Sequence, residues 1–320
     1  MLKDRISRRN ALKGIGSTVG SLFFLDTYKT YSEEANKTTN PKTKFIFCLN
    51  TGTIRGQKLS LDKEVDIAAK AGYNAIEPWV ESIQRFKESG GSLKDLAKKI
   101  SDLGLSVESA IAFPEWIVDD ENRRRKGIEN LKYSMDLVSQ ISGKRIAVPP
   151  AGATNIEIPL DIAIERYKHV LEISEDFGVI PQLELWGFSK TIHLLGQAMY
   201  VVIESGHKNA CVLADVFHMY KGGSNFNGLA FCGGSAIQVF HMNDYPSTPP
   251  RQEINDSFRV MPGDGVAPLT QILQCLNNIG GTKVLSLELF NQEYWKMDPL
   301  ETAKIGLSKM RNVVATAISN

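Results

Sequence analysis

The 320-residue sequence predicts an α/β protein that folds as a single-domain (β/α)8 barrel, the TIM barrel. Eight short apolar runs alternate with longer amphipathic segments along most of the chain. The apolar runs are nearly continuous, which is typical of parallel strands buried on both faces. Several amphipathic segments end in glycine just before the next apolar run, as helices do. A doubly wound open sheet is the alternative, disfavoured because no G-x-G-x-x-G motif follows the first strand.

The strands are predicted where β-branched and other apolar residues form runs too short for helices. In chain order these are KFIFCLN (44–50), YNAIEPW (73–79), LSVESAIAF (105–113), RIAVPPAG (145–152), IPQLELWG (180–187), ACVLADVFH (210–218), IQVFHMNDYP (237–246) and VLSLELF (284–290).

The helices are predicted where one face is apolar at the 3.6-residue period. In order these are DKEVDIAAKAG (62–72), SLKDLAKKISDLG (92–104), NRRRKGIENLKYSMDLVSQIS (122–142), LDIAIERYKHVLEISEDFG (160–178), TIHLLGQAMYVVIESG (191–206), PLTQILQCLNNIG (268–280) and DPLETAKIGLSKMRNVVATA (298–317). The sixth strand is followed only by a short, glycine-interrupted segment, so its helix is weakly predicted. Together the segments give eight βα units in one domain.

The N-terminus resembles a twin-arginine export signal. Arg8 and Arg9 follow Ser7 in SRRNALK, and a weakly apolar segment follows that is too short to span a bilayer as a mature helix. A basic disordered tail is the alternative. We therefore expect residues 1–35 to be a signal peptide and polar linker, residues 36–320 to be the barrel, and the enzyme to be exported, in the periplasm or beyond, without a membrane span.

Charge and cysteine content exclude several classes of function. Residues 1–30 carry a net charge of +4 and the other 290 residues a net charge of −3, so the barrel lacks the basic excess of a nucleic-acid binder. The four cysteines form no C-x-x-C pair, which argues against a disulfide scaffold or a cysteine zinc site. A small molecule is therefore the expected partner, and a homo-oligomer remains open.

Four polar residues lie at the ends of apolar strands in the second half of the chain: Glu184, Asp215, His241 and Glu288. Active sites of TIM barrels lie at the C-terminal ends of the strands. Any one of these residues could be a buried ion pair or a hydrogen-bonded core histidine. Together they predict a site for one divalent ion, with Mn²⁺, Mg²⁺, Co²⁺ or Fe²⁺ favoured over Zn²⁺ because the ligands are mainly carboxylates.

The sequence resembles the xylose-isomerase-like TIM barrels, which include sugar phosphate isomerase/epimerases, ketose 3-epimerases and hydroxypyruvate isomerase-like proteins. The resemblance spans residues 44–316, and its motifs are LELW, DVFHM, VFHMND, RVMPGDG and LELF. It implies that Glu184, Asp215, His241 and Glu288 bind the metal. It also implies that His218, three residues after Asp215, contacts the substrate or lies beside the metal.

The resemblance implies an isomerase or epimerase that acts on a sugar or sugar derivative. Glu184 and Glu288 would remove and return a proton next to a carbonyl through a metal-stabilised enediolate, and His218 would polarise an oxygen. Because of the export signal we expect a non-phosphorylated substrate. Arg259, Glu77 and Trp186 are further candidate substrate contacts, although a structural carboxylate at Glu77 and a packed ring at Trp186 are equally compatible with the sequence.

Two other activities remain as alternatives on the same residues. A lyase could remove the same proton from a 3-keto-glycoside and expel the aglycone by β-elimination. A carbohydrate-binding barrel without turnover is the second, and the intact set of four residues counts against it. The barrel endonucleases of the superfamily need more histidines than the five present here, which argues against a nuclease. Ketose epimerases carry an arginine soon after the strand-seven histidine, whereas here the next arginine is Arg251, which argues against a free ketose as the substrate.

Overall fold

The computed structural model describes residues 44–319. The predicted export signal lies outside the described residues, as do the first residues of the predicted barrel domain. All eight predicted strands are present, most of them shorter than the apolar runs. They are β1 Lys44–Asn50, β2 Ala75–Glu77, β3 Ser106–Val107, β4 Arg145–Val148, β5 Ile180–Glu184, β6 Val212–Asp215, β7 Ile237–Met242 and β8 Thr282–Leu287.

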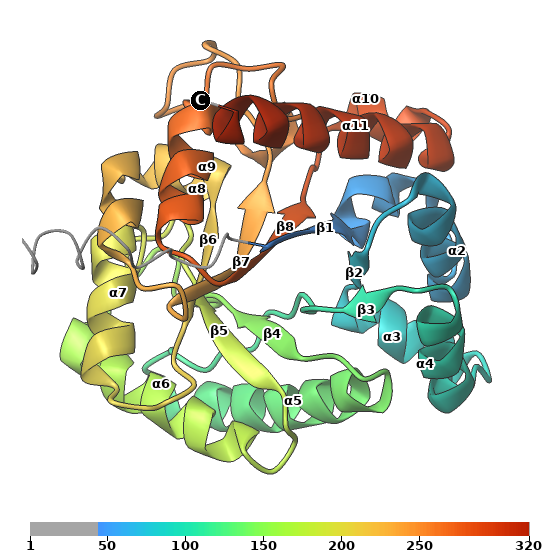
Figure 1. Cartoon of the computed structure of the whole chain (residues 1–320). Helices are drawn as coiled ribbons and strands as arrows, with labels where there is room; N and C mark the ends of the chain where they lie inside the picture. The colour runs from blue at the N-terminus through green and yellow to red at the C-terminus, as the bar shows by residue number, and fades with distance from the viewer. Residues whose placement is uncertain (1–43, 320) are drawn as a thin grey trace, which may run out of the picture. The chain divides into compact units, whose positions relative to one another are not determined.

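The strands form one parallel sheet that curls into a barrel (Figure 1). Its hydrogen-bonded order is β3-β2-β1-β8-β7-β6-β5-β4, with β1 paired to both β2 and β8. The ends of this order are joined by two backbone hydrogen bonds, from the N–H of Lys144 to Val107 (3.2 Å) and from the N–H of Ala147 to Ala110 (2.9 Å). The predicted (β/α)8 barrel is therefore confirmed, and the open sheet is not the fold.

The helices lie outside the strands (Figure 1). They are α2 Leu61–Ala71, α3 Val80–Glu88, α4 Leu93–Asp102, α5 Glu121–Gln140, α6 Leu160–Ser174, α7 Leu195–Glu204, α8 Val216–Gly222, α9 Leu269–Asn278, α10 Gln292–Lys296 and α11 Pro299–Ile318, with the 3-10 turns η1 Thr51–Gln57, η2 Phe226–Phe231 and η3 Asp256–Phe258. The sequence did not predict α3 and α10. Only three residues of α3 and none of α10 are buried, so neither has a full apolar period.

The buried apolar residues form two clusters. The larger one packs the helices against the outside of the strands. The smaller one takes residues from seven of the eight strand segments: Cys48, Ala75, Ile111, Ala147, Leu213, Val239 and Val284. Such a ring of small and branched side chains fills the interior of a TIM barrel, so the barrel is a packed core and its mouth is the place for a site. Within the described residues, no helix has the length and apolar character to cross a membrane.

Candidate functional site

The four predicted ligands lie at the C-terminal ends of adjacent strands. Glu184 is the last residue of β5 and Asp215 the last residue of β6, while His241 is the next-to-last residue of β7. Glu288 directly follows β8. Because β5, β6, β7 and β8 are neighbours in the sheet, their ends meet at one part of the barrel mouth.

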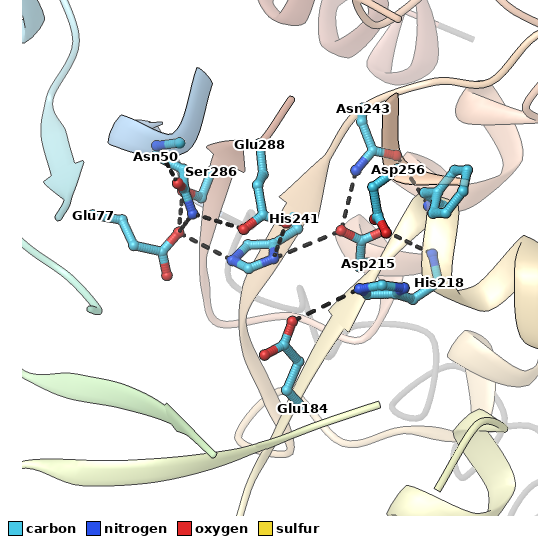
Figure 2. A network of polar contacts seen from close by, with 12 residues as sticks. Asn50, Glu77, Glu184, Asp215, His218, His241, Asn243, Asp256, Ser286 and Glu288 are labelled. Atoms are coloured by element: carbon cyan, nitrogen blue, oxygen red, sulfur yellow. Dashed lines mark hydrogen bonds and ion pairs between the residues drawn. The ribbon is translucent and has the colours of Figure 1, made fainter. Parts of the chain in front are cut away.

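Three of these residues bring their ligand atoms together. One atom each from Asp215, His241 and Glu288 lies within 4.8 Å of the other two. His241 Nδ1 lies 3.1 Å from Glu288 Oε2 and 3.6 Å from Asp215 Oδ2. Figure 2 shows the His241 ring between these carboxylates, with Glu184 on another side of the ring. Glu184 is outside the three-residue cluster, and its Oε1 lies 4.0 Å from His218 Nε2.

Glu77 holds the His241 ring through its second ring nitrogen, Nε2. Glu77 Oε2 lies 3.0 Å from His241 Nε2 and accepts hydrogen bonds from Ser286 (2.6 Å) and Asn50 (2.9 Å) (Figure 2). Glu77 is completely buried and does not line the cavity next to the cluster. Glu77 therefore fixes the imidazole and leaves Nδ1 facing Asp215 and Glu288, while its predicted contact with the substrate stays a prediction.

The carboxylates control the protonation of His241. Burial alone would lower the pKa of its imidazole, but Glu288 and Glu77 outweigh burial and hold that pKa well above the usual range. Burial also favours the neutral form of Glu77, yet the adjacent imidazole keeps the pKa of that carboxyl below its ordinary value. A divalent ion bound at Nδ1 would therefore compete with a tightly held proton.

Arg259 supplies the second positive charge of the cluster. Its Nη1 donates to Asp215 Oδ2 (2.6 Å) and to Glu288 Oε2 (2.9 Å), and its Nη2 donates to Asp256 Oδ1 (2.6 Å). Arg259 is 0% exposed and is not part of the cavity wall. The guanidinium of Arg259 therefore orients these carboxylates and helps to hold the pKa of Asp215 well below its usual range, while its predicted role in substrate binding stays a prediction.

A cavity of about 250 Å³ opens beside the cluster. Glu184, His218 and Glu288 contribute polar groups to its wall. The other wall residues are mostly aromatic: Trp79, Phe113, Trp186, Phe188 and Phe290, with Arg55, Ile111 and Asp256. Trp186 thus lies where the sequence predicted it, and the cavity combines flat apolar faces with a few polar groups, as sugar-binding sites do.

The Glu184 carboxyl on the cavity wall has a strongly raised pKa. Burial raises the pKa of Glu184 to about 8, and the negative charges of Glu288 and Asp215 add to that effect. Its Oε2 is buried without a hydrogen-bond partner among the described residues. A carboxyl with a pKa near neutrality can give or accept a proton at physiological pH, which is what a general acid–base residue must do.

His218 lies at the start of α8, where its backbone N–H donates to Asp215 Oδ1 at 2.8 Å. Burial lowers the pKa of its imidazole, so the neutral ring is favoured. Arginine is always a donor, so the 3.2 Å contact from Arg259 Nη2 makes His218 Nε2 the acceptor. Nδ1 then carries the ring proton; this nitrogen is buried and has no hydrogen-bond partner among the described residues.

Two glycines allow the loops around His218 to pack. A Cβ on Gly187 would lie 2.4 Å from the backbone oxygen of His218, and a Cβ on Gly222 would lie 2.0 Å from the backbone oxygen of His193. Gly223 ends α8 at φ +90°, where glycine is favoured. The close contact at Gly187 therefore sets the distance between the loop after β5 and α8.

The sequence argument missed Asn50, Asn243 and Asp256. Asn50 ends β1, and its Nδ2 donates to Glu288 Oε1 at 3.0 Å as well as to Glu77. Asn243 donates to Asp215 Oδ2 at 3.1 Å and follows β7 by one residue. Both satisfy the criterion of a polar residue at a strand end and could have been found. Asp256 lies in a loop with no strand signal, and only the structure places it against Arg259.

The cluster fits a divalent cation. Carboxylate and imidazole ligands are the usual donors for such ions. His241 Nδ1 is buried where the carboxylates converge and has no hydrogen-bond partner among the described residues, so it can serve as a ligand atom once its proton is released. Its other ring nitrogen is fixed by Glu77, the arrangement that orients imidazole ligands in many metal sites.

Comparisons with known proteins identify relatives over most of the chain. Residues 65–313 match the family model described as xylose isomerase-like TIM barrel. The inosose isomerase of Halalkalibacterium halodurans is 33% identical over 277 residues, which cover 84% of this chain and 96% of the relative. The 3-dehydroshikimate dehydratase of Pseudomonas putida is 19% identical over 256 residues, which cover 78% of this chain and 39% of that protein.

A solved structure of the IolI protein with a bound zinc atom superimposes with a TM-score of 0.79. It is 25% identical, and the match covers 85% of this chain and 99% of IolI. A metal-binding relative thus shares the barrel over almost its whole length.

Proposed function

The chain belongs to the xylose isomerase-like TIM barrel family, and from that premise we propose that it is a divalent-metal-dependent isomerase or epimerase of a sugar or keto-polyol. The observation that carries the proposal is the convergence of Asp215, His241 and Glu288 beside a cavity whose wall includes Glu184. Inosose isomerases among the relatives support a polyhydroxylated ketone of inosose type as the substrate class.

The side chains divide the reaction between them. Glu184 and Glu288 both line the cavity, so one can take the proton from the carbon next to the substrate carbonyl and the other can return it. The electron pair of the broken C–H bond moves onto the carbonyl oxygen, giving an enediolate. His218 donates a hydrogen bond to a substrate oxygen. A divalent ion held by Asp215, His241 and Glu288, with Glu184 as a fourth ligand, would supply positive charge for the developing oxyanion.

Metal content tests the first part of the proposal. We expect purified wild-type protein to hold close to one equivalent of a divalent metal, and His241→Ala to lose it because the orphan nitrogen is removed. Glu184→Gln is the comparison variant. It keeps the volume of the side chain and leaves the three-residue cluster intact, so it should lose less metal than His241→Ala. Wild-type protein that binds none of Mn²⁺, Co²⁺, Fe²⁺, Mg²⁺ or Zn²⁺ in a direct titration would contradict the metal dependence.

Hydrogen exchange tests the chemistry. Incubation with inososes and keto sugars in D₂O, followed by NMR, should show deuterium at a carbon next to the carbonyl together with an isomer or epimer. A carbohydrate-binding barrel would give no exchange in any of these compounds.

A lyase is the second candidate, and the dehydratase of Pseudomonas putida supports it because dehydration also removes a proton next to a carbonyl. In that case Glu184 or Glu288 would take the proton, the C–H electrons would form the C=C bond, and the β-substituent would leave with the other carboxyl acting as acid. Release of an aglycone from a 3-keto-glycoside, without a new isomer, would select this reaction.

We also propose that the enzyme is exported and acts on a non-phosphorylated substrate, as the Arg8-Arg9 motif predicts. Cell fractionation of the full-length chain and of an Arg8→Lys/Arg9→Lys variant tests this. The wild type should appear in the periplasmic fraction and the variant should stay in the cytoplasm; a wild-type protein found only in the cytoplasm would overturn the proposal.

A further inference from the structure

A second cavity, of about 380 Å³, adjoins the first at the barrel mouth. The 3-10 turn η1 after β1, the start of α2 and the start of α3 build it, so it belongs to the loops after β1 and β2. Arg55 and Trp79 line both cavities. The Arg55 guanidinium lies 4.1 Å from the centroid of the Trp79 ring, at this boundary. A molecule that occupies the first cavity can therefore extend into the second.

The wall of the second cavity contains a buried carboxyl with one oxygen that has no hydrogen-bond partner among the described residues. Glu64 lines the cavity and is 3% exposed, and its Oε2 makes no hydrogen bond to any described residue. Burial raises the pKa of Glu64 to about 8, against the opposing influence of Arg85, Thr51 and Arg55. At neutral pH the carboxyl is mainly protonated, so it adds little negative charge to the cavity wall.

The charged groups of the wall have a positive excess. Arg55, Lys58 and Arg85 line the cavity, and Glu81 is the one exposed carboxylate among the wall residues. Glu81 pairs with Arg85 at 2.5 Å and with Arg55 at 3.7 Å. Lys58 follows η1 as an exposed residue, and no described side chain pairs with its ammonium group. With Glu64 protonated, the net charge of these five groups is +2, which suits an anion.

We propose that this second cavity is a subsite for an anionic substituent of the substrate, a carboxylate or a phosphate, held by Arg55, Arg85 and Lys58 while the carbonyl end occupies the first cavity. Guanidinium groups bind such oxyanions in pairs of hydrogen bonds, and a neutral Glu64 carboxyl would not repel the anion. The inference rests on the proposed function for the reacting end of the substrate. It distinguishes this chain's substrate from an uncharged inosose or ketose.

Paired sugars provide the test. Isothermal titration at pH 7 compares glucuronate with glucose and glucose 6-phosphate with glucose, on wild-type protein carrying its metal. We expect one anionic sugar to bind at least about tenfold more tightly than glucose, because hydrogen bonds between charged groups are the strong ones. Glucuronate as the tighter ligand would identify a carboxylate and agree with a non-phosphorylated substrate; glucose 6-phosphate would identify a phosphate and contradict that expectation.

Two variants and one control tie the preference to the cavity. Arg55→Gln and Arg85→Gln should each reduce the preference for the anionic sugar by roughly tenfold or more. Both side chains are well exposed, at 41% and 58%, so neither change should unfold the protein. Lys87→Gln is the matched control, because Lys87 lies on the same helix α3 but not on the cavity wall, and it should keep the preference.

The inference is overturned if neither anionic sugar binds more tightly than glucose, including the case in which none of the three sugars binds. It is also overturned if the preference survives both arginine substitutions. These results are separable from the deuterium-exchange test. Exchange on neutral keto sugars without an anion preference removes only the subsite, whereas an anion preference without any exchange removes only the proposed catalysis.

Discussion

Replacing Glu64 by Gln should stabilise the protein, by an amount that grows with pH. The carboxyl of Glu64 has a pKa of about 8 in the folded chain and an ordinary value of 4.5, because burial disfavours the charged form. The folded state therefore holds a proton that the unfolded chain releases, and stability falls as pH rises from about 4.5 to about 8. At 1.36 kcal/mol per pH unit the full penalty is about 5 kcal/mol above pH 8 and about 1 kcal/mol at pH 5.

Urea unfolding at pH 5, 6, 7 and 8 measures this effect. The difference in free energy of unfolding between Glu64→Gln and wild type should rise by about 4 kcal/mol across that range, because glutamine cannot ionise. Glu81→Gln is the control on the same cavity wall, because it is the same substitution at a side chain that is 59% exposed and not buried. A difference for Glu64→Gln that does not change with pH would refute the reasoning.

Three further changes test the reaction site. Glu77→Gln should weaken metal affinity by about 10- to 100-fold, because it replaces the carboxylate that holds His241 with an amide. A Mn²⁺ titration measures this. Glu184→Gln should lower kcat by about 10²- to 10⁴-fold on a substrate found by deuterium exchange, and a urea midpoint at pH 7 no lower than that of the wild type is the control for folding. Arg259→Met leaves the carboxylates of Asp215 and Glu288 without their buried partner and should lower the free energy of unfolding by about 3–5 kcal/mol; a loss below 1 kcal/mol would contradict the ion-pair role.

The fold and the strand-end positions were predictable because both follow from local rules. A parallel barrel buries both faces of each strand, so a continuous apolar run with a polar residue at its end identifies the strand and its functional end together. Glu184, Asp215, His241 and Glu288 were found in this way, and the structure places them at adjacent strand ends.

The roles of Glu77 and Arg259 were not predictable from the same rule. A polar residue at a strand end can point into the cavity or toward another polar side chain below it. Glu77 pairs with Asn50 in the β1–β2 register and meets His241, which is 164 residues further along the chain. Arg259 reaches Asp215 from a loop 44 residues later. These contacts depend on barrel closure, which no local pattern encodes.

Glu64 illustrates a signal that was present in the sequence. The buried residues of α2 are Leu61, Glu64, Val65 and Ala68, a spacing that places the carboxyl on the inward face of the helix. A glutamate at an inward position must be paired, protonated or part of a site. Periodicity could thus have identified Glu64, whereas the cavity it lines required the loops after β1 and β2.

In our proposal the two cavities divide the barrel mouth between chemistry and recognition. The groups proposed for metal binding and proton transfer lie at the ends of β5 to β8, where Asn50 and Arg259 donate hydrogen bonds to Glu288 and Glu77 holds His241. The charged wall residues Arg55, Lys58, Glu81 and Arg85 of the second cavity are exposed, whereas Glu64 is buried. Burial of Glu64 lowers stability at neutral pH, and Thr51 and the nearby arginines offset only part of that loss. A glutamine of the same size would avoid it, so a carboxyl that lowers stability on a cavity wall is what the proposed subsite predicts and what packing alone does not.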